Sequence, residues 1–218
     1  MTIDETRAYM ADWSKKLCDE GFLVDYQGSL SCRVGETMLI SPRKKKLSAL
    51  KPDDIILVDI QSGSMTTGAN PPADFSVHRE IYRNRKDINA LVHSFELNFL
   101  TCSKSGKTIY PLLDDMAQIV GPTARTAAYT EPVKNKVRSA VVKKLKKRNA
   151  VLLSDNGALC AGNDLDDTHA VCQVFMKGCK CFIETEFLGG GKRINPLETR
   201  LMRLVYLMKY SKQTVENR

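Results

Sequence analysis

The sequence is poor in the residues that metal sites and membrane spans need. It has three histidines, His78, His93 and His169, so a site with three imidazole ligands would have to use all of them. Its hydrophobic runs are short and interrupted by charge, and none approaches the roughly 20 residues that a membrane-spanning helix requires. The first five residues are polar and acidic, whereas a secretory signal begins with basic and then apolar residues. We therefore expect no membrane span and no secretory signal.

Cysteine pairs with the C-x-x-C spacing are also missing. The chain has seven cysteines, an odd number, and they are scattered through apolar stretches. This usage is typical of proteins in a reducing compartment, which predicts a cytoplasmic location. We expect these side chains to act as small buried apolar groups. That interpretation is favoured over metal binding even for Cys179 and Cys181, the closest pair.

The 218 residues are 43% hydrophobic, which suffices for one buried core, and we expect a single domain over residues 1–218. Lys and Arg number 33 against 25 Asp and Glu, a net charge of +8. Much of the excess lies in residues 134–148, where basic residues surround an apolar line that includes Val137 and Val141. An exposed amphipathic helix is the favoured interpretation, because aromatic stacking residues and nucleic-acid motifs are absent there. Binding of nucleic acid or an acidic partner is the lesser alternative.

Local patterns predict a mixture of helices and short strands. Thr2 and Glu5 form a capping-box pattern before a helix that ends at Gly21. Asp155-Asn156-Gly157 is the strongest hairpin signal, with a strand expected on each side. Further strands are expected at 30–34, 38–40, 55–60, 89–93 and 124–129, and helices at 73–83, 97–102, 114–120, from Pro132 onward, 165–186 and 196–209. This order favours an α/β or α+β domain with a largely antiparallel sheet.

Six sequence blocks together resemble the class II aldolase/adducin family, over about residues 8–210. They are residues 28–33, similar to G-N-x-S-x-R; 40–42; 50–54; 74–82; 89–93, similar to N-A-V-V-H; and 153–162, similar to L-x-N-H-G. The resemblance implies an α/β/α three-layer sandwich with a central, mainly antiparallel sheet. It also implies a homotetramer with sites between subunits, and chemistry in which zinc polarises a carbohydrate oxygen while a carboxylate moves a proton.

The family's zinc ligands are not all present in this chain. His93 stands at the first ligand position, but Phe95 stands at the second and Asn156 at the third. Phenylalanine has no donor atom, and an amide oxygen suits harder ions than zinc. Glu96 is one residue further along and should face the other side of the strand. We therefore expect no zinc cofactor and assign no metal ligand.

The remaining family positions suggest a modified ligand site. Asp74 stands where the family has its catalytic Glu, so it is our candidate catalytic residue, although a helix N-cap is the favoured role. Candidate ligand-binding residues are Ser29, Ser41, Lys44, His93 and Asn156. The basic loop 43–46 could replace the lost phosphate contacts, but a solvated loop is favoured. His78 and His169 are expected to be buried, hydrogen-bonded core residues.

These observations predict a divergent, zinc-free family member that binds a small sugar- or hydroxyacid-like ligand. Whether it retains an aldolase, lyase or isomerase activity stays open at this point. The main alternative is a non-catalytic, oligomeric binding protein of the adducin type. The expected partners are a small molecule and further copies of the chain, as a homotetramer.

Overall fold

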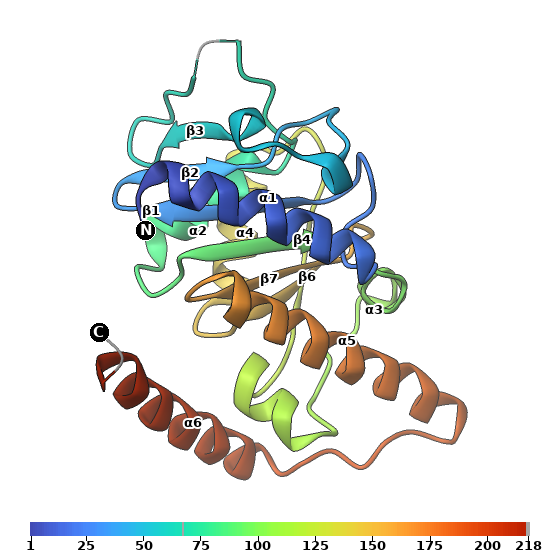
Figure 1. Cartoon of the computed structure of the whole chain (residues 1–218). Coiled ribbons are helices and arrows are strands. Elements are labelled where there is room, and N and C mark those ends of the chain that lie inside the picture. The colour runs from blue at the N-terminus through green and yellow to red at the C-terminus, as the bar shows by residue number, and fades with distance from the viewer. Residues whose placement is uncertain (67, 217–218) are drawn as a thin grey trace.

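The computed structural model describes residues 1–66 and 68–216, and its centre is one seven-stranded sheet (Figure 1). The strand order is β3-β2-β1-β4-β7-β6-β5. All neighbouring strands are antiparallel except β5 and β6, which are parallel. The strands are β1 (Ser29–Val34), β2 (Thr37–Ile40), β3 (Ile56–Asp59), β4 (Ala90–Ser94), β5 (Thr126–Ala127), β6 (Ala150–Leu153) and β7 (Ala158–Gly162).

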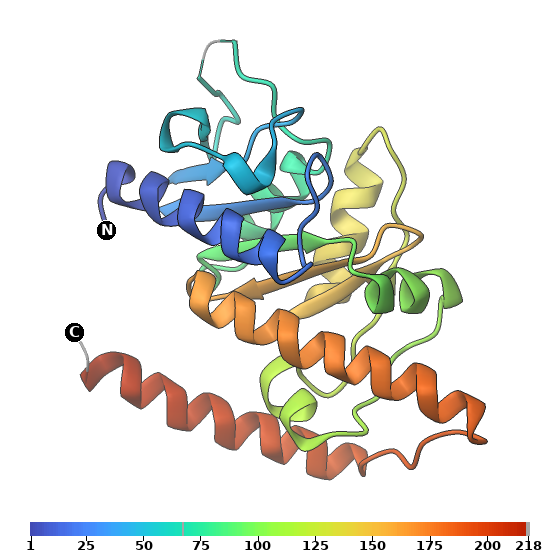
Figure 2. The same cartoon turned by 45° about the vertical axis from the view of Figure 1, so that its right-hand side comes forward.

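Helices cover both faces of this sheet, which confirms the predicted three-layer sandwich with a mainly antiparallel sheet (Figures 1 and 2). One face carries α1 (Ile3–Asp19), α3 (Leu97–Ser105) and α5 (Leu165–Phe187). The other carries α2 (Phe75–Asn84) and α4 (Asn135–Leu145). Short helical turns lie at η1 (Leu47–Ala49), η2 (Pro52–Asp54) and η3 (Met116–Val120), and α6 (Pro196–Glu216) runs along the outside of the fold.

Alternation along the strands divides the core into two layers. In β4, Ala90 and Val92 pack with α1 and α5, whereas Leu91 packs with α2 and α4. Because successive side chains of a strand point to opposite faces, one strand supplies both layers. The consequence for function is that His93, which follows Val92, lies on the α2 side of the sheet.

Most predicted elements are confirmed, with two corrections. The Thr2 and Glu5 capping box is present, and strands flank the turn at 154–157 as expected. The helix predicted to start at Pro132 instead begins at Asn135, because Lys134 occupies the N-cap position in an extended conformation. The strand predicted at 124–129 is only the two residues Thr126 and Ala127, since only these pair with β6.

Two expectations about composition can also be compared with the structure. No helix among the described residues is both long and apolar enough to cross a bilayer. All seven cysteines are free thiols, and five of them, Cys32, Cys102, Cys160, Cys172 and Cys179, are buried in the core as predicted. The cytoplasmic location stays a prediction.

Candidate functional site

The candidate site lies at one end of the central strands. Ser29 at the start of β1 pairs with His93 near the end of β4, and the turn between β6 and β7 places Asn156 beside them. The turn approaches very closely, since a Cβ on Gly157 would lie 2.2 Å from the carbonyl oxygen of Ser94. Gly157 also has a φ of +69°, which only glycine adopts without strain. The turn at Asp155-Asn156-Gly157, which the sequence predicts, therefore positions part of the site.

Asp74 is the centre of the hydrogen-bond network, which corrects its predicted role as a helix cap. Although it occupies the N-cap position of α2, its side chain accepts no hydrogen bond from that helix. Its Oδ2 instead accepts from Ser29 Oγ at 2.7 Å and from His93 Nδ1 at 2.6 Å. His78 Nε2 lies 3.3 Å from the same oxygen. The Asp74 side chain thus contacts Ser29 and His93 on the sheet and His78 on α2, instead of capping the helix backbone.

His93 is held as an imidazolium. Its Nδ1 faces the Asp74 carboxylate, and its Nε2 lies 2.7 Å from the backbone carbonyl oxygen of Asn156. Both partners are acceptors, and a histidine can donate from both nitrogens only when it is doubly protonated. Burial lowers the pKa of His93, but the hydrogen bond and charge of Asp74 outweigh that effect and raise it above the ordinary value.

The same contacts keep Asp74 ionised. Burial alone would raise the pKa of this carboxyl, but the neighbouring His78 and His93 hold it well below the ordinary value. Both Asp74 and His93 are 3% exposed, so the two charges neutralise each other inside the protein. A carboxylate with so low a pKa is a poor proton acceptor at neutral pH.

A second line of hydrogen bonds supports the pair from behind. His78 Nε2 lies 3.2 Å from Ser29 Oγ, and His78 Nδ1 lies 2.8 Å from Ser31 Oγ. Ser31 Oγ in turn lies 2.8 Å from Tyr82 Oη. Because Ser29 donates to Asp74, it accepts from His78, and the bonding pattern assigns the proton of His78 to Nε2. His78 is fully buried and hydrogen-bonded, as predicted.

The donors at the three family ligand positions do not suit zinc. Both nitrogens of His93 are already directed at acceptors, and Phe95 packs its ring against the imidazole with centroids 4.6 Å apart. The amide of Asn156 donates to the carbonyl oxygen of Ser154 at 2.8 Å. Within residues 1–66 and 68–216, no group of three or more His, Cys, Asp or Glu side chains is arranged to hold a metal ion. A zinc site with three imidazole ligands needs converging neutral imidazoles, and these three positions supply only one.

A cavity of about 290 Å³ is lined by Asp74 and His93. Two of the residues that line it each have a buried polar atom without a hydrogen-bond partner, Asp74 Oδ1 and Tyr129 Oη. The first is an acceptor and the second can donate. Burial, followed by the charges of Asp74 and Glu131, raises the pKa of Tyr129, so the phenol keeps its proton. Unpaired buried polar atoms are costly, so this pair is suited to a ligand.

The rim of the cavity is basic. Arg43, Lys44 and Lys45 line it, and the acidic residues of the lining are Asp74 and Glu131. Lys45 is 3.0 Å from Asp54 in an ion pair, whereas Arg43 and Lys44 form no ion pair with any acidic group that the structure describes. Lys44 has a φ of +61°, the left-handed conformation that favours glycine. The basic loop therefore borders the cavity instead of being only a solvated loop.

The structure brings most of the predicted site residues together, but not in the predicted way. Lys44, Asp74, His93 and Asn156 line the cavity, with Asn156 contributing its backbone carbonyl rather than its amide. Ser29 lies behind Asp74. Ser41 does not line the cavity, because its Oγ accepts from the backbone N–H of Leu30 in the core. Glu96 caps α3, away from the cavity, as its strand position predicts.

Several residues of this site were not predicted from the sequence. Tyr129 and Glu131 belong to the segment after β5, whose path no local pattern predicts. Ser31 and Tyr82 left a detectable signal, since each is a polar group on a face that periodicity predicts to be buried. His169 on α5 has a polar partner, Glu20, as predicted. It is only partly buried, however, so its predicted core position is wrong.

Comparisons with known proteins agree with this fold. The family model of the class II aldolase and adducin N-terminal domain matches residues 8–183. A 5-deoxy-D-ribulose 1-phosphate aldolase of Bacillus thuringiensis is 24% identical over 88% of this chain and 91% of its own length. An L-fuculose phosphate aldolase of Methanocaldococcus jannaschii is 29% identical over 76% of this chain and 89% of its own. The solved structure of an L-fuculose 1-phosphate aldolase, 21% identical, matches 93% of this chain and 96% of its own with a TM-score of 0.87.

Proposed function

Because the chain belongs to the class II aldolase and adducin N-terminal domain family, we propose that its cavity binds a small sugar- or hydroxyacid-like molecule without zinc. The observation that carries this proposal is the pair of unpaired buried atoms, Asp74 Oδ1 and Tyr129 Oη. A ligand hydroxyl can donate to the carboxylate oxygen, while a second ligand oxygen accepts from the phenol. Sugars and hydroxyacids carry such oxygens on neighbouring carbons.

The basic rim indicates that the ligand also carries an anionic group. Arg43 and Lys44 have no acidic partner in the described part of the chain and border the cavity. Ammonium and guanidinium groups bind phosphate or carboxylate directly. The two relatives are named as aldolases of phosphorylated sugars, which supports a phosphorylated ketose as the first compound to test.

The absence of zinc from this proposal rests on donor chemistry. Phe95 offers no ligand atom, and His93 would have to leave both Asp74 and the Asn156 carbonyl to coordinate a metal. Metal analysis of protein purified without chelator tests this directly. We expect far less than one zinc per chain. Stoichiometric zinc that disappears in His93→Gln would contradict the proposal.

Binding is tested by calorimetry with L-fuculose 1-phosphate, the unphosphorylated sugar and lactate. We expect the phosphorylated sugar to bind most tightly, and Tyr129→Phe to weaken it about tenfold, because a buried hydrogen bond to a polar partner is lost. Lys44→Gln should weaken the phosphorylated sugar selectively. Lys46→Gln is the matched control, since Lys46 belongs to the same loop but pairs with Asp25 and does not line the cavity. Equal effects of both lysine substitutions would contradict the assigned rim.

A second candidate function is lyase chemistry without a metal. The observation in its favour is that a carboxylate oxygen and a protonated phenol, a possible base and acid, border the same cavity. The low pKa of Asp74 argues against it, so binding without turnover is the primary proposal. Cleavage of a ketose phosphate that Asp74→Asn abolishes, in metal-free protein, would establish the second function instead.

A homo-oligomer forms part of the same proposal. The outer face of α6 exposes large apolar side chains, which an isolated chain in water does not favour. The family resemblance points to further copies of this chain as the occupant, and a tetramer is the expected assembly.

A further inference from the structure

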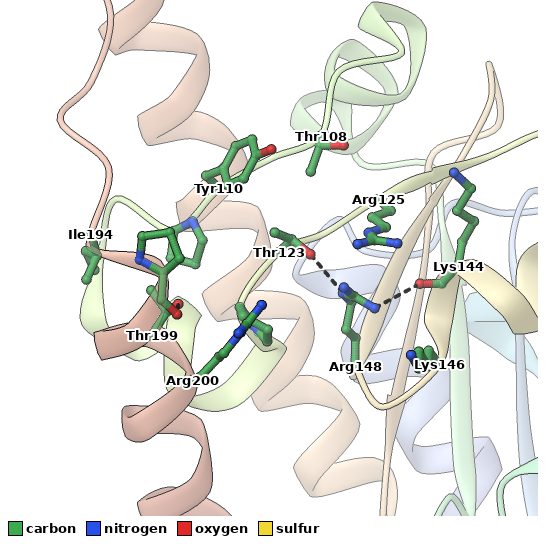
Figure 3. A pocket seen from close by; sticks show the side chains of 13 residues that line it. Thr108, Tyr110, Thr123, Arg125, Lys144, Lys146, Arg148, Ile194, Thr199 and Arg200 are labelled. Carbon is green, nitrogen blue, oxygen red and sulfur yellow. Dashed lines mark hydrogen bonds between the residues drawn. The ribbon is translucent and has the colours of Figure 1, made fainter.

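A second and larger cavity, of about 550 Å³, lies on another part of the molecule (Figure 3). It is bordered by the segments 108–111 and 122–125, the end of α4 and the start of α6. It shares no lining residue with the cavity at Asp74 and His93. Its size falls within the range of pockets that hold small organic ligands.

The charge of this cavity is entirely positive. Five basic residues line it and no acidic residue does; the five are Arg125, Lys144, Lys146, Arg148 and Arg200. None of them forms an ion pair with an acidic side chain among residues 1–66 and 68–216. Elsewhere on this surface lysines do pair with acids, as Lys177 does with Asp115. The cavity is therefore a place where positive charge is gathered and left uncompensated.

Arg148 is fixed in place rather than solvated. It is 9% exposed, its Nε donates to Thr123 Oγ1 at 2.9 Å, and its Nη1 lies 3.5 Å from the carbonyl oxygen of Lys144 (Figure 3). Neither contact uses Nη2. Burial and then the nearby charge of Arg125 lower the pKa of this guanidinium. A buried arginine without a carboxylate partner is costly, and a bound anion would offset that cost.

The opposite wall has a different chemistry. Tyr110, Ile194 and Thr199 lie across the cavity from Arg125, Lys144 and Arg148, with Arg200 next to Thr199 (Figure 3). The lining also includes Pro111, Pro122 and Pro196. Arg193 covers the ring of Tyr110 at 4.1 Å from its centroid, which adds a sixth cation close by. One side of the cavity thus suits phosphate groups, and the other suits the organic part of the same molecule.

We propose that this second cavity binds a small organic polyphosphate, with its phosphates against Arg125, Lys144 and Arg148 and its organic part against Tyr110. Guanidinium groups form paired hydrogen bonds with phosphate oxygens, and five cations match a ligand with three or four negative charges. The enclosure by prolines and by the start of α6 favours a small molecule over a duplex nucleic acid. This inference does not depend on the ligand proposed for the first cavity.

The test is calorimetry on the full chain at low salt, with tripolyphosphate, ATP and adenosine as probes. We expect one tripolyphosphate per chain, tighter binding of ATP, no binding of adenosine, and loss of affinity as salt is added. Arg125→Gln should weaken tripolyphosphate about tenfold, because charge-assisted hydrogen bonds are lost. Arg125 is exposed and its side chain makes no hydrogen bond in the described structure, so this variant should fold normally.

Two controls make the result specific. Lys147→Gln removes the same charge next to the cavity but not from its lining, and it should leave binding unchanged. Lys44→Gln, at the first cavity, should also leave tripolyphosphate binding unchanged. No binding of tripolyphosphate at low salt, or equal losses with Arg125→Gln and Lys147→Gln, would overturn the proposal. So would a fall in molecular mass by light scattering in Arg125→Gln without any tripolyphosphate binding, since the cavity would then hold a neighbouring subunit.

Discussion

At the level of single residues, the Asp74 carboxylate holds two of the three histidines of the chain against one end of the sheet. It accepts from His93 at 2.6 Å and lies 3.3 Å from His78. The result is a buried, neutral ion pair in which His93, at the position where the family resemblance implies a metal ligand, is a hydrogen-bond donor. The imidazolium joins Asp74 to the Asn156 turn.

This pair predicts a characteristic pH dependence of stability. Folding raises the pKa of His93 above 6.5, so its contribution is complete below pH 6.5 and is lost as the pH rises through the folded-state pKa. Folding lowers the pKa of Asp74 below 3.8, so that contribution is present above pH 3.8 and is lost as the pH falls through the folded-state pKa. The pair should therefore stabilise most between about pH 4 and 6.5.

His93→Gln tests this expectation by chemical denaturation across pH. At pH 6 the substitution should lower the free energy of unfolding by roughly 3 kcal/mol, because it leaves Asp74 buried without its charged partner. The difference from the unmodified protein should shrink above pH 6.5. A difference that is constant from pH 5 to pH 9 would contradict the assignment of His93 as an imidazolium.

A glycine predicts a second effect at this scale. Gly157→Ala should lower the free energy of unfolding by about 2 to 4 kcal/mol, since its Cβ would lie 2.2 Å from the Ser94 carbonyl oxygen and φ is +69°. Gly189→Ala is the matched control: φ is +95°, but nothing lies within 4 Å of the added Cβ. It should cost only about 1 kcal/mol of backbone strain. Similar losses in the two variants would show that the close approach to Ser94 is unimportant.

Part of this site could be predicted because it depends on positions along strands. His93, Phe95 and Asn156 follow from the family blocks, and the two-residue alternation of a strand explains why His93 and Phe95 are neighbours. The role of Asp74 could not be predicted, because an aspartate at this position can either cap the helix or contact the sheet, and the local sequence is the same in both cases. Tyr129 escaped prediction since its position depends on how the segment after β5 returns to the sheet.

At the level of secondary-structure elements, local signals located helices and strands more reliably than their ends. Capping at Thr2 and the turn around Asn156 depend on a few adjacent residues, so sequence alone identifies them. The start of α4 was misplaced, because Pro132 is a common first helical residue but is equally at home in a loop. The pairing of β4 with both β1 and β7 joins distant segments, so no local signal predicts it.

Helix α5 offers a test of how packing stabilises an element. Phe175 is fully buried and its ring lies 5.1 Å from that of Phe99, whereas Phe187 on the same helix is 86% exposed. Phe175→Ala should lower the free energy of unfolding by about 4 kcal/mol, through lost burial and a cavity in the core. Phe187→Ala should change it by no more than about 0.5 kcal/mol in a monomeric state. Urea denaturation compares the two, and equal effects would contradict the assigned layer.

At the level of the whole molecule, part of the excess of basic residues behind the net charge of +8 gathers at two cavities. Arg43 and Lys44 border the first cavity, and Lys144, Lys146 and Arg148 at the end of α4 border the second. The basic segment 134–148 was predicted to be a solvated helix face, but its C-terminal residues line the second cavity. The alternative of nucleic-acid binding stays a prediction, but both clusters now have a small-molecule interpretation that separate variants can test.

Helix α6 connects the fold to an assembly. It attaches to the rest of the chain through polar contacts: Arg203 donates to the carbonyl oxygens of Gln118 and Ile119, and Thr199 is buried. Its other face carries apolar side chains that are 49–76% exposed, namely Leu197, Leu201, Leu204, Val205 and Met208. A soluble helix normally has the opposite arrangement, with its apolar face on the core. A second copy of the chain would bury this face.

The substitution Leu201→Glu tests that interpretation. Leu201 is 61% exposed, so a charge there should not disturb the folded chain, but it would be buried without a partner in an oligomer. We expect light scattering to show an oligomer for the unmodified protein and a shift toward the monomer for Leu201→Glu. Val24→Glu is the matched control, because Val24 is 52% exposed but lies outside α6. An unmodified chain that is monomeric at high concentration, or an oligomer that Leu201→Glu leaves intact, would leave the apolar face of α6 without its proposed role.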